Sequence, residues 1–425
     1  MYLYTMKNNI KWLYFLGAGI YFLQGIEGLP GLSLFFYLKE TLHLDVSTIM
    51  YIGTITSIAW LIKPLLGYFI DTFFTKKKWM VFSILGSIIT CLFLGLSPII
   101  SLSLLIGLMT LSSSNTAIRD IATDGLSCIE GKENKNTGQI QATQWGSITI
   151  ASIFVGLGGG LVAQFCNYKI AFLCLIPFYF LMLFVVNKFK ETKQCSSNNC
   201  KNCKHFNSCN KYVHESLVLM TNCPNHSKII ESKSHIESIK SYRELFTNKS
   251  FVFTCLFLFF YNYSPSFGTP LSFIERDIFG WSKMWMGTLG AIVSAISVLG
   301  AIFYFHYSKK LNIRKWLFAS VFIGATSSLC YLYFTPFTAV LYGVIFASVG
   351  LFIQLIMLDF MARTSLPGKE AVSFALLCSI TNFAGTCSSL SGAYLFPKIG
   401  LRPLIILSAL TSFVCLFFIR KLEIK

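Results

Sequence analysis

Ionisable side chains occur in stretches of this sequence that are otherwise apolar enough to lie inside a membrane. Arg119, Asp120 and Asp124 follow the aliphatic run 102–111. A charge placed in hydrocarbon costs roughly 2.5–3.5 kcal/mol, so such residues normally face a protein-lined or water-filled cavity. Asp120 and Asp124 are four positions apart and share a helical face, whereas Arg119 points about 100° away from Asp120 toward another neighbour. A functional site is the interpretation that we favour over packing at a helix end.

Two further ionisable residues lie in other apolar runs. Glu27 stands between Gly25 and Pro30, a composition that predicts a kinked helix with free backbone polar groups near mid-membrane. Glu27 is either part of a site or a neutral carboxyl bonded to a neighbouring helix. Lys63 precedes Pro64, and it either snorkels to the interface or faces a cavity.

The composition is that of a membrane protein. Hydrophobic residues make up 54% of the chain and charged residues 12%, against about 25% charge in a soluble domain. The first apolar run has no small-residue cleavage site, so we interpret it as a membrane span. The basic residues lie mostly in the loops between apolar runs, which argues for membrane orientation and against binding to nucleic acid.

The apolar runs predict an all-α membrane protein with twelve transmembrane helices in two six-helix halves. A polar segment, 190–249, separates an N-terminal bundle, 1–189, from a C-terminal bundle, 250–425. This arrangement is typical of transporters with paired halves. The runs span about 11–38, 48–70, 80–98, 101–125, 140–164, 167–188, 251–275, 284–306, 315–335, 338–362, 371–395 and 401–420.

The distribution of Lys and Arg predicts the orientation. Basic residues concentrate on the side of both termini and of segment 190–249, so we expect that side to be cytoplasmic. We expect the membrane to be the plasma membrane. On the opposite side, we expect Glu275, Arg276 and Asp277 to form an exposed charge cluster without a special role.

Segment 190–249 is rich in Cys, His, Lys, Ser and Asn. Cys200 and Cys203 form one Cys-x-x-Cys pair, but Cys195 and Cys209 do not complete a second pair at matching spacing. A flexible, reduced linker is the favoured interpretation, with a structural zinc site as the alternative. We therefore predict no metal and no cofactor.

A motif follows the second apolar run. Gly67 and Asp71 in Gly-x-x-x-Asp spacing are followed by three lysines that include Lys77. This motif resembles the loop signature of the major facilitator superfamily. The resemblance implies a role in conformational switching.

Longer matches resemble the folate–biopterin transporter family. They comprise Tyr21–Gly25, Phe35–Glu40, Trp60–Gly67, Arg119–Gly125, Leu366–Glu370 and Phe374–Gly385. The resemblance implies the major facilitator fold and import of folates or pterins, commonly by proton symport. Arg119 and the Cys-rich segment depart from the family pattern, which leaves the exact ligand open. A related branch that carries muropeptides, or a carrier of another organic solute, is an alternative within transport.

The expected ligand suggests roles for the site residues. A pterin offers a planar donor pair that suits a carboxylate, either Asp120 or Glu27. Arg119 and Lys63 are candidates for holding a folate tail, and Trp145 for stacking on the ring.

We also assign Gln24 and Asn382 to the substrate site. The pair Asp120 and Asp124 is the candidate for proton coupling, with protons as the coupling ion. We expect a monomer in the lipid bilayer.

Other functional classes are less well supported. The apolar runs contain no nucleophile–base pairing at a recognisable spacing, so we do not expect an enzyme. A non-transporting membrane receptor or scaffold with a metal-binding cytosolic loop is the alternative outside transport.

Overall fold

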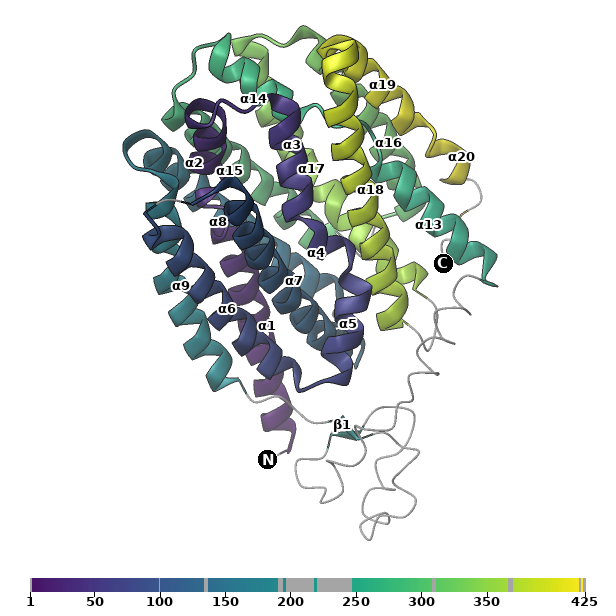
Figure 1. Ribbon diagram of the computed structural model, residues 1–425. Coiled ribbons are helices and arrows are strands. Elements are labelled where there is room, and N and C mark those ends of the chain that lie inside the picture. The colour runs from purple at the N-terminus through teal and green to yellow at the C-terminus, as the bar shows by residue number, and fades with distance from the viewer. Residues whose placement is uncertain are drawn as a thin grey trace.

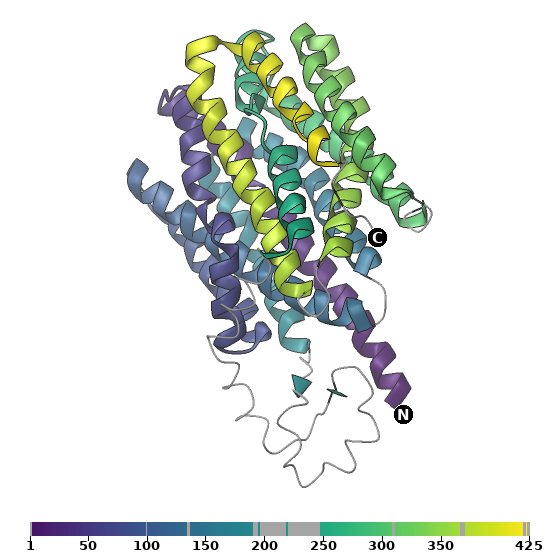
Figure 2. The same cartoon turned by 90° about the vertical axis from the view of Figure 1, so that its right-hand side faces the viewer.

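The computed structural model describes residues 2–98, 100–133, 137–189, 194–195, 218–219, 247–307, 311–365, 370–419 and 422. Helices from the first part of the chain and helices from the second part form two groups that lie against one another (Figure 1). The same two groups are seen from the side in Figure 2.

The N-terminal half is built from helices that account for the first six predicted spans. They are α1 (Tyr2–Ile26), α2 (Pro30–Phe36), the π-helix η1 (Tyr37–Thr41), α3 (Val46–Thr56), α4 (Ile58–Leu61), α5 (Lys63–Thr72), α6 (Lys76–Leu96), α7 (Leu102–Glu133), α8 (Thr137–Phe165) and α9 (Tyr168–Lys188).

The C-terminal half accounts for the other six predicted spans. Its elements are α13 (Lys249–Asn262), α14 (Gly268–Asp277), α15 (Lys283–Tyr307), α16 (Ile313–Cys330), the 3-10 helix η6 (Tyr331–Tyr333), α17 (Pro336–Thr364), α18 (Glu370–Ile399), α19 (Leu401–Phe413) and α20 (Leu416–Ile419). Between the halves, the strands β1 (Gln194–Cys195) and β2 (Val218–Leu219) pair antiparallel. The other predicted zinc-site residues, Cys200, Cys203 and Cys209, lie outside the described residues.

Eight of the described helices are individually long and apolar enough to cross a membrane. The other four spans are α1–α2, α3–α5, α7 and α13–α14. The spans α1–α2, α3–α5 and α13–α14 are each interrupted. The span α7 is continuous but carries the charged residues Arg119, Asp120 and Asp124. The prediction of twelve transmembrane helices in two halves is therefore confirmed.

The first span breaks where the sequence predicts a kink. Helix α1 ends at Ile26, a turn covers residues 27–29, and Pro30 opens α2 at its first position, where a missing N–H costs nothing. Gly25 is required there, because a Cβ would lie 2.5 Å from the Cβ of Ala151 in α8. The break leaves Glu27 in the turn, between two helices.

We name the two ends of the bundle by residues that lie there. The Lys76 side is the end at which α5 ends and α6 begins, and the Lys39 side is the end at which η1 and the α14–α15 connection lie. Helices α8 and α15 run between these two ends in opposite halves, and they make the most extensive contact between any two helices.

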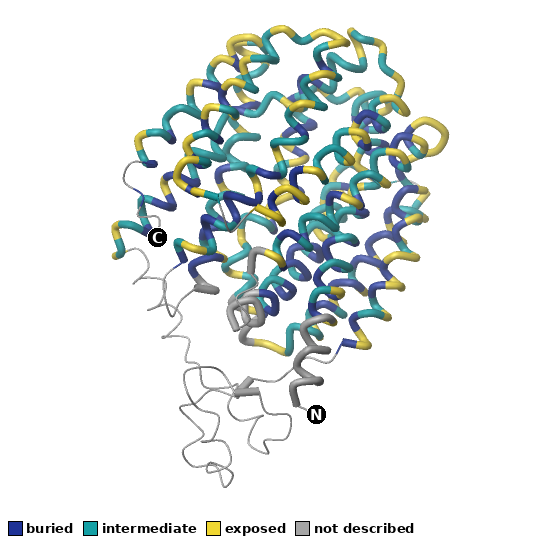
Figure 3. The backbone as a smooth tube through the Cα atoms, turned by 180° about the vertical axis from the view of Figure 1, so that it is seen from behind, coloured by how far each residue is buried: buried dark blue, intermediate teal, exposed yellow. Residues whose placement is uncertain are grey.

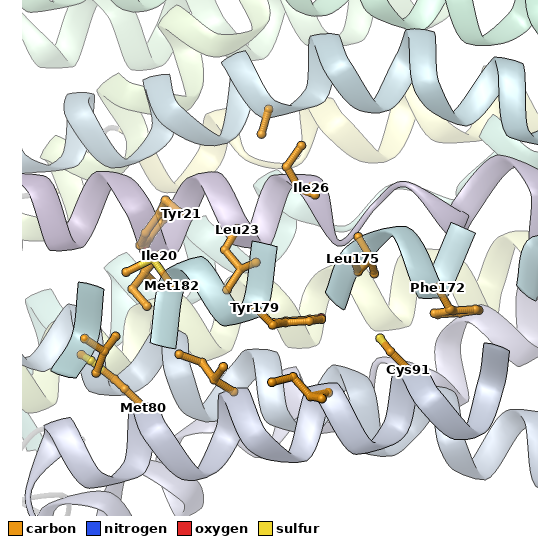
Figure 4. Close-up of a cluster of buried hydrophobic side chains, with 14 of the residues drawn as sticks. Ile20, Tyr21, Leu23, Ile26, Met80, Cys91, Phe172, Leu175, Tyr179 and Met182 are labelled. Atoms are coloured by element: carbon orange, nitrogen blue, oxygen red, sulfur yellow. The ribbon is translucent and has the colours of Figure 1, made fainter. Parts of the chain in front are cut away.

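Each half has its own buried core. In Figure 3, buried positions follow the inner faces of the helices and exposed positions lie mainly outside. The core of the N-terminal half contains side chains of α1, α6 and α9, and Figure 4 shows Tyr179 among Leu23, Leu175 and Cys91. The polar site described next is built into this apolar core.

Candidate functional site

Glu27 is bound by three side chains from two other helices. Its carboxylate accepts hydrogen bonds from the Thr116 hydroxyl (2.8 Å) and the Tyr179 hydroxyl (2.7 Å), and it forms an ion pair with Arg119. Helices α1, α7 and α9 therefore meet at one carboxylate. We call Glu27, Thr116, Arg119 and Tyr179 the Glu27 cluster.

Arg119 is the largest fully buried side chain in the described part of the protein. One of its nitrogens, Nη2, pairs with Glu27, and the guanidinium lies 5.8 Å from the centre of the Tyr179 ring. Its Nε and Nη1 have no hydrogen-bond partner among the described residues. A buried cation in this position depends on its single carboxylate partner, because an unpaired buried charge is expensive.

A second ionic cluster lies one residue further along α7. Lys63, at the start of α5, forms an ion pair with Asp120, and its Nζ lies 4.7 Å from the centre of the Trp60 ring. Asp124 accepts a hydrogen bond of 2.7 Å from the Tyr21 hydroxyl of α1. We call Tyr21, Trp60, Lys63, Asp120 and Asp124 the Asp120 cluster.

The Asp120 cluster lies toward the C-terminal half. Cys378 of α18 lies near Lys63 and Tyr21. The Asn382 amide, one turn further along α18, donates to the Trp60 carbonyl oxygen at 3.3 Å. The Lys63 side chain retains 13% exposure, whereas Arg119 has none. Of the two cations predicted to hold an anionic group, Lys63 is therefore the accessible one.

A cavity of about 490 Å³, largely open to its surroundings, lies between α8, α15 and α17. Its lining includes the Trp145 indole, four hydroxyl groups and one amide, and no ionisable side chain. The polar residues are Thr149, Ser152, Ser294, Ser297 and Gln354. The cavity thus combines the aromatic ring of Trp145 with neutral polar groups from both halves.

Ion pairs join the two halves on the Lys39 side. Lys39 of η1 pairs with Asp277 at 2.5 Å, and Glu40 pairs with Arg276 at 2.8 Å and with Lys283 at 2.5 Å. Of the expected exposed cluster Glu275, Arg276 and Asp277, only Asp277 is exposed, and Arg276 and Asp277 take part in these ion pairs. Both lie at the end of α14, where they pair with Lys39 and Glu40 of η1. We call these five residues the Lys39-side ion pairs.

The remaining predicted residues lie in different surroundings. The Oε1 atom of Gln24 is buried without a partner among the described residues. Lys77 donates to the carbonyl oxygens of Asn187 and Phe189, both at 2.8 Å, and so holds the end of α9.

A Cβ at Gly67 would make only an ordinary contact, 3.7 Å, with Ile121. Asp71 lies in α5, but its side chain is outside the described residues.

Several site residues were not found from the sequence. Tyr21, Thr116 and Tyr179 are partners of the predicted carboxylates, and the hydroxyl residues of the cavity belong to ordinary apolar spans. Tyrosine, serine and threonine are common in apolar helices, so only the contact with a charged or aromatic group distinguishes these positions. The spacing of such residues along one helix carries no signal of a partner on another.

A family model matches residues 24–404 of the chain, and its description is the BT1 family. The chain is similar to the folate-biopterin transporter of Synechocystis, with 22% identity over 93% of the chain and 77% of the relative. It is also similar to the probable folate-biopterin transporter 4 of Arabidopsis thaliana, with 23% identity over 90% of the chain and 88% of the relative.

Solved transporters share the fold. A D-xylose-proton symporter superposes with a TM-score of 0.68 at 11% identity, covering 98% of both chains. The nucleoside transporter NupG superposes with a TM-score of 0.62 at 16% identity, covering 97% of this chain and 98% of NupG. At these identities the likeness establishes the major facilitator fold alone.

Proposed function

Because the chain belongs to the BT1 family and is a membrane transporter, we propose that it carries folate- or pterin-type organic anions by proton-coupled alternating access. The observation that carries the proposal is the buried ion pair of Lys63 and Asp120, on the side of the N-terminal half that meets α18. The relatives named as folate-biopterin transporters support the substrate class.

The Asp120 cluster offers a physical route to coupling. Lys63 is a cation that a substrate carboxylate can bind, but Asp120 already occupies it. A proton taken up by Asp120 removes the competing charge and frees Lys63 for the substrate. Asp120 then carries one proton while Lys63 binds one anion. The ion pair between Lys63 and Asp120 re-forms when the proton and the anion leave.

Asp124 provides a second carboxylate in the same cluster. It is within electrostatic range of both Asp120 and Lys63, and its hydrogen bond comes from the neutral Tyr21 hydroxyl. We propose that Asp120 and Asp124 together carry the coupling proton.

Alternating access requires that the two halves open on alternate sides. We propose that the Lys39-side ion pairs close one side in this conformation, and that the Lys76 side is cytoplasmic in the plasma membrane. In this account, residues 1–189 and 250–425 move as the two bundles, and segment 190–249 connects them. The protein acts as a monomer, and protons are its coupling ion.

Uptake by the purified protein in proteoliposomes tests this function. We expect labelled folate or biopterin to accumulate above equilibrium when the outside is made acidic, and a protonophore to abolish the accumulation. Metal analysis of the isolated chain tests the receptor alternative. A protein that binds zinc and moves neither compound would refute the proposal.

A further inference from the structure

The cavity between α8, α15 and α17 is lined by residues other than those of the two ionic clusters. None of its lining residues belongs to the Glu27 cluster or the Asp120 cluster, and none is ionisable. An anionic group placed there would find no counter-charge in the lining, whereas a neutral group can use its aromatic and hydrogen-bonding side chains. The lining therefore suits an uncharged part of an occupant.

The position of the cavity follows from the packing of α8 against α15. Gly156 contacts α15 so closely that a Cβ would lie 2.5 Å from the Ala291 nitrogen. Ser152 is one turn before Gly156, and Ser294 is about one turn after Ala291, and both line the cavity. The helices thus touch at the glycines and leave a cavity between their small polar residues on the Lys76 side of that contact.

The lining has hydrogen-bonding capacity that the protein does not use. The hydroxyls of Thr149, Ser152, Ser294 and Ser297 donate to carbonyl oxygens of their own helices, so each retains a free acceptor. The Trp145 indole N–H and the Gln354 amide make no hydrogen bond to any described residue. A ligand can therefore find an aromatic face, donors and acceptors within one cavity.

We propose that this cavity binds the uncharged, planar heteroaromatic part of the substrate, with Trp145 stacked on the ring and Gln354 hydrogen-bonded to its edge. This assignment rests on the proposed function and divides the substrate between two places. The ring enters the cavity, and an anionic tail pairs with Lys63.

Ring binding in this cavity also connects the two halves. Trp145 of α8 packs against buried residues of both halves, and Gln354 belongs to α17 of the C-terminal half. A ring that contacts both residues stabilises the arrangement in which these helices line one cavity. Binding energy from the ring thereby favours one conformation of the carrier.

Three probes separate the two parts of the substrate: folate, biopterin, which has the ring without a carboxylate tail, and p-aminobenzoylglutamate, which has the tail without the ring. Their dissociation constants are measured on the purified full chain by ligand-dependent thermal stabilisation. The variants are Gln354→Leu and Trp145→Leu. The matched control is Gln164→Leu, which changes an exposed glutamine of α8 outside the cavity.

We expect both cavity variants to weaken biopterin binding by about tenfold or more and to change p-aminobenzoylglutamate binding by less than about twofold. Retained binding of the tail probe shows that the variants are folded. Biopterin affinity equal to wild type in both variants would overturn the cavity assignment and leave the proposed function standing. A wild-type protein that binds none of the three probes would overturn both.

Discussion

Lys63 and Arg119 are both paired with carboxylates, but their surroundings give them different uses. Arg119 is fully buried in the N-terminal half, where its charge holds α1, α7 and α9 together through Glu27. Lys63 keeps some exposure and lies near α18, so its partner can be exchanged for a substrate group. We therefore propose that Arg119 stabilises the half and that Lys63 belongs to the transport path.

Asp120→Asn is expected to abolish uphill uptake of folate and to leave exchange of labelled for unlabelled folate across the membrane. The amide cannot take up a proton, but it also no longer competes with the substrate for Lys63. The matched control is Asp359→Asn. It removes a carboxylate of α17 that pairs with Arg363 of that same helix. Uphill uptake by Asp120→Asn at the wild-type rate would exclude Asp120 from coupling.

Glu27→Gln is expected to destabilise the protein by about 3–5 kcal/mol, because it leaves the buried Arg119 charge without a partner. Thermal denaturation in detergent measures the loss. The double variant Glu27→Gln with Arg119→Met removes both charges and should recover most of the stability. If the single and double variants denature at the same temperature, the ion pair does not hold the half together.

At the scale of the helices, glycines determine how closely the halves approach. Gly156 and Gly160 of α8 face Gly287 of α15, and any side chain there would meet backbone atoms of the other helix. Close backbone approach at small residues is a common way in which membrane helices associate. The contact lies between the Lys39-side ion pairs and the cavity, and we propose that it is the pivot of the movement.

Gly156→Ala is expected to disrupt the contact between α8 and α15 and to lower the denaturation temperature, with a cost of about 1–3 kcal/mol from overpacking. Gly146→Ala, ten residues earlier in the same helix, is the control, because a Cβ there meets nothing within 4 Å. Alanine should be neutral or slightly stabilising at Gly146. Equal effects of the two substitutions would argue against a tight contact at Gly156.

Helices were predictable from the sequence to the extent that their signals are local. Apolar runs revealed the twelve spans, and Pro30 with its neighbouring glycines indicated the break at Glu27. The pairing of Arg276 with Glu40 was missed, because these residues are 236 positions apart and nothing near either one indicates the other. The cavity was missed for the same reason: its lining comes from three helices, and only Trp145 was assigned to a site.

At the scale of the whole molecule, the Lys39-side ion pairs hold one end of the two halves together. Burial of Glu40 raises the pKa of its carboxyl, but hydrogen bonds and charges from Lys283 and Arg276 outweigh burial and lower that pKa below its ordinary value. A lowered pKa means that the ionised form stabilises the closed arrangement. That stabilisation is complete above the ordinary glutamate pKa of about 4.3 and is lost as the pH falls through the lowered value.

Acidification below about pH 4 on the Lys39 side is therefore expected to increase the population that is open on that side. Spin labels at the exposed positions Thr41 and Ile278, in a variant without reactive cysteines, report the separation by electron paramagnetic resonance. Glu40→Gln should be open at neutral pH and show a weaker response to acid. A separation in wild type that does not change with pH or salt would contradict this role.

Proton movement that accompanies substrate uptake tests the central claim most directly. Proteoliposomes that contain a pH-sensitive dye are given unlabelled folate with no pH gradient, and proton entry is recorded beside uptake of labelled folate. We predict that folate drives protons inward in wild type and that Asp120→Asn takes up folate down its gradient without proton entry. Equal proton entry per folate in both proteins, or folate uptake by wild type with no proton entry, would contradict the account.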